Sequence, residues 1–99
     1  MRVEISATAE AELEQIGDYI AKDSPLRAVS FVDELFVAAQ SLGDHPEAYR
    51  LIPRYERYGY RRCPYGLYLI IYSIETDHVA VAHFLHSAQD YETILFPER

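Results

Sequence analysis

Apolar positions in the first forty residues repeat with the period of an α-helix. After a short alternating stretch at residues 3–5, the apolar side chains recur at steps of four, three and four: Ala9, Leu13, Ile16 and Ile20. This spacing places them on one face of an amphipathic helix. Ser6 precedes the pattern and is expected to be the N-cap, because its hydroxyl can accept from a free amide of the first turn. The acidic residues between the apolar ones are expected to be solvated: Glu10, Glu12, Glu14 and Asp18.

A second helix is predicted directly after the sequence Asp23-Ser24-Pro25. Ser24 is its expected N-cap, and Pro25 fits the first turn, where a missing N–H costs nothing. A broad apolar stripe follows: Ala28, Phe31, Val32, Leu35, Phe36, Ala39 and Leu42. Gly43 is the expected C-terminal cap, and Pro46 prevents continuation. Because the connection is so short, the two helices are predicted to form an antiparallel hairpin.

From residue 59 onward the pattern changes from helical to extended. Residues 47–58 have mixed polarity and are expected to form a long loop arm. Strands are predicted at 59–63, 67–74 and 79–86, with turns at 64–66 and 75–78. The stretch 67–74 is almost wholly apolar, which is typical of a central strand covered on both faces. Residues 87–96 are predicted to close the chain with one short helix that carries Tyr91, Ile94 and Leu95 inward.

The predicted order is therefore β-α-α-β-β-β-(α). A helical hairpin packed on one face of a small, mostly antiparallel sheet is an α+β fold. A chain of 99 residues is expected to form a single domain over residues 1–99, since a second one would be too small for its own core.

Charge is distributed unevenly along the chain. The formal net charge is −7, and residues 1–48 alone carry ten acidic and three basic side chains. Residues 50–62 hold five arginines against Glu56 alone. An acidic body argues against direct specific DNA binding by this chain, because neutralising phosphates needs many cations. The arginine segment instead fits a focused contact with an anion or an acidic partner.

Motifs of common enzymes are missing from the sequence. It contains no phosphate-binding glycine loop, nucleophile elbow or zinc-protease helix. Cys63 is the only cysteine, which excludes an internal disulfide and a metal site of several thiolates. His83 and His86 are three residues apart on a predicted strand, so they should lie on opposite faces unless a bulge intervenes. We therefore expect neither a metal nor a cofactor.

The start of the chain lacks the apolar stretch of a signal peptide, and no segment approaches the ~18 apolar residues of a membrane span. The expected location is the cytoplasm, without a membrane partner.

Six tyrosines fall within 18 positions and alternate with arginines: Tyr55, Tyr58, Tyr60, Tyr65, Tyr68 and Tyr72. Tyrosine and arginine dominate the energetics of protein interfaces. The same mixture can stack on exposed RNA bases, and part of it can simply pack beneath the loop arm. We expect Tyr68 and Tyr72 to be structural, and Tyr58 and Tyr60 to be more accessible.

Ordered motifs over residues 3–95 resemble one known family. They are Val3-Glu4-Ile5-Ser6, residues 11–16 and 18–21, Asp23-Ser24-Pro25 with Phe31-Val32-Asp33, His45-Pro46-Glu47, residues 59–63 followed by 68–72, and residues 84–90. In their order and spacing they resemble the RelE/ParE superfamily of toxins from type II toxin–antitoxin modules, and the ParE branch most closely. The resemblance implies a plasmid-stabilisation toxin that is neutralised by a cognate ParD-like antitoxin.

Two activities are associated with this superfamily. ParE-like members are associated with poisoning DNA gyrase, whereas RelE-like members are ribosome-dependent mRNA endoribonucleases. Cleavage needs cations that hold RNA and groups that move protons, yet Lys22 is the only lysine, and His83 and Ser73 stand where arginines are common in the family.

The leading hypothesis is therefore a gyrase inhibitor that acts by binding and has no catalytic residues. Its predicted partner-binding residues are Arg54, Arg57, Tyr58, Tyr60, Arg61 and Arg62. One alternative is an mRNA endoribonuclease that uses Arg61, His83 and Tyr91. The other is an inactive homologue that only binds the antitoxin.

Overall fold

The secondary structure follows the predicted order. The structure is a computed structural model that describes residues 1–97, so the last two positions of the predicted domain lie outside the described residues. Its elements are β1 (Arg2–Ile5), α1 (Ala7–Ala21), α2 (Pro25–Ser41), the 3-10 turn η1 (Glu56–Tyr58), β2 (Tyr60–Tyr65), β3 (Tyr68–Ile74), β4 (His78–His86) and α3 (Tyr91–Leu95). The α+β class is confirmed.

The four strands form one mixed sheet in the order β1-β4-β3-β2. β1 runs parallel to β4, whereas the β4–β3 and β3–β2 pairs are antiparallel. β3 is central, and Ile70, Ile71 and Tyr72 are fully buried, as predicted for a strand covered on both faces. The register between β3 and β4 shifts where Tyr72 pairs with Val81 and Ile71 pairs with His83. The extra residue of β4 is a bulge.

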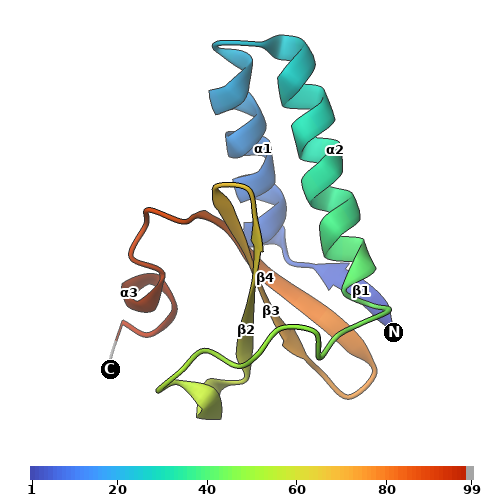
Figure 1. The fold of residues 1–99 in the computed structure, drawn as a ribbon, viewed down its shortest axis with the longest axis vertical. Coiled ribbons are helices and arrows are strands. Elements are labelled where there is room, and N and C mark those ends of the chain that lie inside the picture. Colours follow the sequence, from blue (N-terminus) through green and yellow to red (C-terminus); the bar gives the residue numbers. More distant parts are fainter. Residues whose placement is uncertain (98–99) are drawn as a thin grey trace.

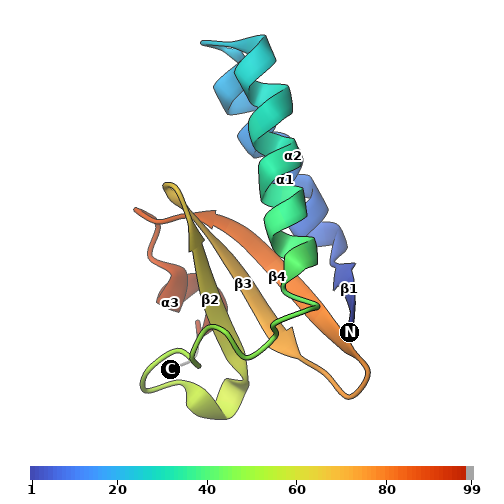
Figure 2. The same cartoon turned by 45° about the vertical axis from the view of Figure 1, so that its right-hand side comes forward.

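Helices α1 and α2 form the predicted antiparallel hairpin and cover one face of the sheet (Figures 1 and 2). The end of the hairpin that carries the interhelical turn projects beyond the sheet. Both predicted N-caps are confirmed: Ser6 Oγ accepts from the Ala9 amide at 3.0 Å, and Ser24 Oγ accepts from the Arg27 amide at 3.2 Å. The main core lies between the hairpin and the sheet and is built around Leu13, Ile16, Leu35, Ile70, Tyr72, Val81 and Phe84.

The opposite face of the sheet is covered by α3 and by the later part of the arm, residues 52–58, whereas Tyr49 at the start of the arm packs against the main core. Leu69, Ile71 and Leu85 form one small cluster there, and Tyr91 and Leu95 pack on it as predicted. The inward position predicted for Ile94 is wrong, because its side chain is 40% exposed. Phe96, directly after α3, is buried in its place.

Two predicted turns differ in detail. β2 continues through Pro64 and Tyr65, and the reversal is made at Gly66, which has a left-handed φ of 57°. Proline is tolerated because β2 is an edge strand. Gly43 follows the cap of α2 but does not have a left-handed φ. Its role is steric, since a Cβ there would collide with the carbonyl oxygen of Met1, whose amino group donates to the Gly43 carbonyl at 2.9 Å.

Candidate partner-binding surfaces

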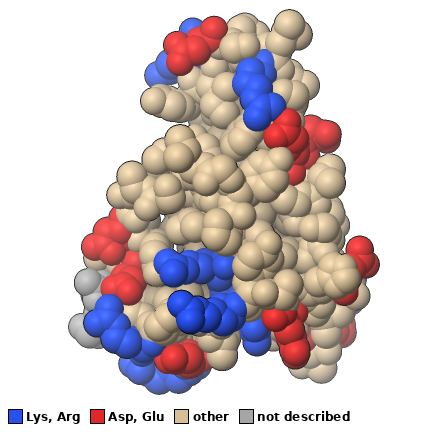
Figure 3. Space-filling view, in the orientation of Figure 1, with Lys and Arg blue, Asp and Glu red and all other residues tan. Residues whose placement is uncertain are grey.

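The six predicted partner-binding residues lie on the arm and on the adjoining edge strand β2, where Arg61 and Arg62 belong to opposite faces of the sheet. The arm is attached to the edge of the sheet by a bridge between Leu51 and Arg61, and the Ile52 amide donates to the Tyr60 carbonyl at 3.0 Å. Basic side chains gather over this lower part of the molecule in the space-filling view (Figure 3). We call the group Arg54, Arg57, Tyr58, Tyr60, Arg61 and Arg62 the basic arm surface.

Two of these arginines are held by internal bonds. Arg61 Nη1 donates to the Tyr49 carbonyl at 2.6 Å. Arg62 Nη1 donates to the Tyr91 hydroxyl at 2.7 Å, and its guanidinium lies 5.4 Å from the centre of the Tyr91 ring. Both side chains are half-buried. Arg61 therefore ties β2 to the arm and Arg62 ties β2 to α3, and both offer only part of their charge to a partner.

Arg54, Arg57 and Tyr58 form the accessible part of the basic arm surface. The Arg54 side chain is 78% exposed and lies 3.5 Å from the Glu92 carboxylate. The Arg57 guanidinium stacks 4.6 Å from the centre of the Tyr58 ring, and its Nη2 donates to the Tyr58 hydroxyl at 3.1 Å. Arg54 has a φ of 73° and is the only non-glycine residue with a positive φ among residues 1–97. Such strain is found preferentially at functional sites.

Part of the tyrosine-rich segment packs beneath the arm, as one of the alternatives held, but the central place of Phe96 in this cluster was not predicted. Phe96 is 3% exposed, stacks on Tyr55 at a centroid distance of 4.1 Å, and lies 4.7 Å from Tyr58. The ring centre of Tyr60 lies 6.1 Å from that of Phe96, and Tyr60 is half-buried, so it is more accessible than the fully buried Tyr72 but less accessible than Tyr58. Tyr58 is exposed as predicted. The segment after α3 thus supports the arm from below.

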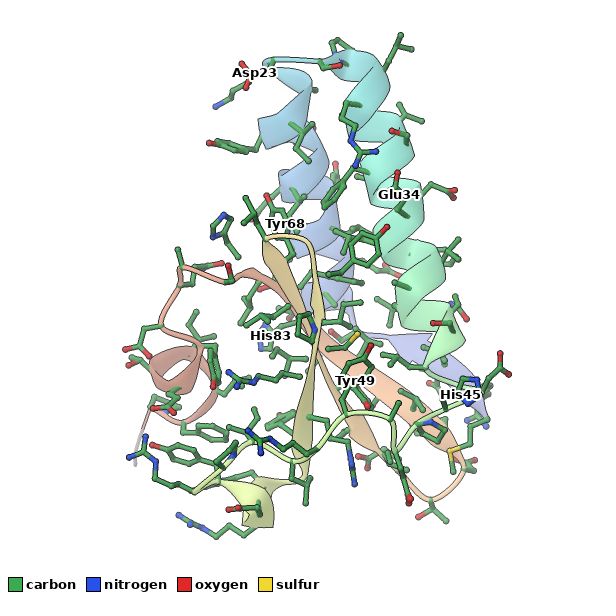
Figure 4. The ribbon with its side chains drawn as sticks, viewed as in Figure 1. Asp23, Glu34, His45, Tyr49, Tyr68 and His83 are labelled. Atoms are coloured by element: carbon green, nitrogen blue, oxygen red, sulfur yellow. The ribbon has the colours of Figure 1, made fainter. Side chains whose placement is uncertain are left out.

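Tyr68 and Tyr72 are structural, as predicted. Tyr72 is fully buried, and its hydroxyl donates to the Pro46 carbonyl at 2.7 Å. Desolvation raises the pKa of Tyr72, which keeps this donor protonated. Tyr68 packs against Phe31 and against the edge of the His86 ring, at centroid distances of 5.5 Å and 5.2 Å. Figure 4 shows Tyr68 beside the hairpin, at the turn between β2 and β3.

The residues of the alternative catalytic set do not converge. Arg61 pairs in register with Tyr72, which belongs to the core on the hairpin side of the sheet. His83 pairs with Ile71, which belongs to the cluster on the α3 side. Tyr91 lies on the α3 side as well, but its hydroxyl is engaged by Arg62. A joint proton-transfer role for these three residues therefore has no support in their geometry.

Glu12 is a structural residue that the sequence pattern placed in solvent. Its side chain is only 21% exposed, and its Oε1 accepts from the Phe84 amide at 3.1 Å. His83 Nδ1 lies 3.0 Å from its Oε2. β1 pairs with β4 only as far as Val81, so beyond that point the edge of β4 that faces away from β3 has no neighbouring strand. The Glu12 carboxylate supplies an acceptor in its place.

A second surface is an apolar groove on the hairpin. We call it the hairpin groove; its apolar lining is Leu13, Gly17 and Ala21 of α1 and Pro25, Ala28, Val29, Val32 and Phe36 of α2. Val29 is 72% exposed and Phe36, a member of the predicted apolar stripe of α2, is 43% exposed. A Cβ on Gly17 would lie 3.0 Å from Val32 Cγ2, so glycine lets the helices approach closely. Glu14, Asp18 and Asp33 also line the groove.

Within residues 1–97, no three side chains of His, Cys, Asp or Glu lie close enough together to hold a metal ion. In the same part of the chain, no helix is both long and apolar enough to cross a bilayer.

Fold and surfaces together define a small α+β domain whose accessible chemistry is suited to binding other macromolecules. The family described as "ParE toxin of type II toxin-antitoxin system, parDE" matches residues 3–91. The chain therefore belongs to the ParE toxin family, which confirms the resemblance found in the sequence.

One solved structure, a chromosomal ParDE toxin–antitoxin system from P. aeruginosa, superposes with a TM-score of 0.74. The likeness covers 87% of this chain and 95% of the other at 16% identity, and it therefore supports the fold. The curated proteins give no match.

Proposed function

We propose that this ParE-family toxin acts in the cytoplasm by binding DNA gyrase, without breaking bonds itself, and that a cognate antitoxin neutralises it. The observation that carries the proposal is the exposed Arg54, Arg57 and Tyr58 group on a chain whose net charge is −7. Arginine and tyrosine combine contact area with hydrogen-bonding ends, which makes them the commonest anchors of protein interfaces. A local positive patch on an acidic body also orients the toxin toward an anionic target.

The mRNA endoribonuclease alternative is less well supported. Arg61 is on β2 and His83 is on β4, with β3 between them. Arg61 is bound to the Tyr49 carbonyl, whereas His83 contacts the Glu12 carboxylate of α1. A general acid, a general base and a phosphate-binding cation must reach one scissile bond together. Binding needs only the basic arm surface as it stands.

Supercoiling of relaxed plasmid by purified gyrase, with and without the toxin, tests the proposal. The toxin should inhibit supercoiling and trap a DNA cleavage complex. The double variant Arg54→Ala/Arg57→Ala should need on the order of tenfold more protein for the same inhibition, since two interface cations are lost. Arg2→Gln, a surface arginine near the N-terminus, is the matched control and should leave inhibition unchanged.

Three results would contradict the proposal. They are unaffected supercoiling with no trapped complex, codon-specific cuts in mRNA of a translating extract, and normal growth of cells that express the toxin without antitoxin. The second result would favour the endoribonuclease, and the third would favour an inactive homologue.

The proposed antitoxin-binding site is the hairpin groove. Val29 and Phe36 present apolar side chains there that the toxin's own elements leave exposed. An amphipathic helix laid in such a groove buries them, which is a common mode of peptide recognition. Val29→Gln should speed dissociation of the antitoxin, whereas Val37→Gln should not. Val37 is also an exposed apolar residue of α2, but it does not line the groove. Equal effects of the two variants would argue against this site.

A further inference from the structure

We infer that the hairpin groove selects an amphipathic helix whose flanks are basic, and that Glu14, Asp18 and Asp33 are the residues that impose this specificity. The inference rests on the proposed docking of the antitoxin in the groove. It adds the chemical character of the docked segment, which the apolar lining alone does not specify.

The size and the position of the hairpin groove suit one docked helix. The groove has a volume of about 660 Å³ and runs between two antiparallel helices. Its apolar floor includes Val29, which is mostly exposed, and no element of the described chain covers it. The hairpin also projects beyond the sheet, so a partner can approach it without meeting the strands (Figure 2).

Charges at the groove are all of one sign. Glu14 and Asp18 come from α1 and Asp33 comes from α2. All three are exposed, and none forms an ion pair within residues 1–97. Glu14 and Asp18 are four residues apart on one helix, where like charges repel. A cationic side chain placed between them would relieve that repulsion.

Glu34, on the other side of α2, differs from the groove carboxylates because it has partners within the chain. Its carboxylate accepts from Arg27 Nη1 at 2.6 Å and from the Tyr65 hydroxyl at 2.9 Å. The hydrogen bond from Arg27 lowers the pKa of Glu34, with the Tyr65 bond adding to the effect. The chain therefore neutralises the acidic residue that faces its own sheet and leaves the groove carboxylates without a cation.

The docked helix should accordingly carry apolar anchors at i, i+3 or i+4, and i+7, with lysine or arginine beside them. Exposed charges at the margin of an interface act chiefly on the association rate and on its salt dependence. The groove carboxylates should thus accelerate encounter, while the apolar floor sets the dissociation rate.

Association kinetics of the toxin with the antitoxin of the same module test this inference. The triple variant Glu14→Gln/Asp18→Asn/Asp33→Asn should associate about tenfold more slowly at low salt, with a smaller salt dependence and a nearly unchanged dissociation rate. The control triple Asp44→Asn/Glu47→Gln/Glu56→Gln changes the net charge equally at exposed positions outside the groove. It should associate nearly as fast as the wild type.

Unchanged or faster association of the groove triple would overturn the inference, since it would mean that the docked segment is neutral or acidic there. Equal slowing by both triples would overturn it as well, because the effect would then belong to the net charge. The Val29→Gln variant separates this failure from that of the proposed docking site. If Val29→Gln speeds dissociation while the groove triple has no effect, the site stands and the basic character of the partner does not.

Discussion

Removing the Phe96 ring should detach the arm from the body of the toxin. Phe96 is 3% exposed and contacts the rings of Tyr55, Tyr58 and Tyr60. Truncation of a buried phenylalanine to alanine costs about 3–5 kcal/mol. The cluster of Ile52, Tyr55 and Phe96 is small, so it can partly collapse around the lost ring, and the lower limit of about 3 kcal/mol applies.

Two measurements on Phe96→Ala check this magnitude. At 4–8 °C per kcal/mol for a domain of this size, Tm should fall by about 12–24 °C. If the arm opens without global unfolding, the loss appears instead in hydrogen exchange of the amides of Ile52, Tyr55 and Gly59. These donate to the carbonyls of Tyr60, Ile52 and Glu56. Their exchange should accelerate by roughly two decades for about 3 kcal/mol.

Ile94→Ala is the matched control, because it removes an apolar side chain that is 40% exposed from the same segment. Its cost should stay below about 1 kcal/mol. A loss below about 1 kcal/mol for Phe96→Ala, with unchanged exchange in the arm, would refute the role given to this ring. Gyrase inhibition should weaken in Phe96→Ala, because a loose arm must be ordered again on binding.

Three further predictions concern single polar residues, which are Glu12, Arg54 and Glu34. Glu12→Ala leaves the half-buried Phe84 amide without its acceptor and should lower the free energy of unfolding, measured in urea, by about 1–3 kcal/mol. Glu12→Gln keeps an acceptor oxygen and should lower it less. Equal losses for the two variants would contradict the role of Glu12 as the acceptor for this amide. Arg54→Gly should raise the free energy of unfolding by up to about 1 kcal/mol, because glycine adopts the positive φ of this position without strain. The same variant should weaken gyrase inhibition, because the arginine side chain is lost. A variant less stable than the wild type would show that no backbone strain is stored at residue 54. The pKa of Glu34 is lowered chiefly by its hydrogen bond from Arg27, so this pair should stabilise the fold above the ordinary glutamate pKa and lose that effect as pH falls through the folded-state pKa. Arg27→Gln should flatten this part of the acid-unfolding profile, and an unchanged profile would contradict the assignment.

Local signals account for what the sequence predicts well. The hairpin follows from a period of three to four residues, two serine caps and one proline. The central strand follows from a continuous apolar run. Each of these signals lies within about twenty residues of chain, where spacing alone determines which side chains share a face.

The errors arise where contacts join distant parts of the chain. In the sequence, Glu12 looks like any other acidic residue of α1. It accepts from the Phe84 amide, 72 positions away, because the pairing of β1 with β4 stops at Val81 and leaves that amide without a strand partner. Phe96 gives no periodic signal because it follows a helix of five residues. Whether Arg61 and His83 share a face depends on strand register, where a shift of one residue reverses the face.

The hairpin groove and the basic arm surface lie at different ends of the molecule, and this separation affects how an antitoxin can neutralise the toxin. The hairpin turn and the arm lie at opposite ends of the longest dimension, which is 40 Å (Figure 1). A helix as long as α2, with 17 residues, spans about 25 Å. One helix in the groove therefore does not reach the basic arm surface, and an antitoxin that neutralises by covering both must continue with a further segment. An antitoxin shortened to the groove-binding helix should still bind the toxin, yet leave gyrase inhibition largely intact, whereas the full antitoxin abolishes it. If the shortened form neutralised equally well in the supercoiling assay, gyrase would have to contact the hairpin itself.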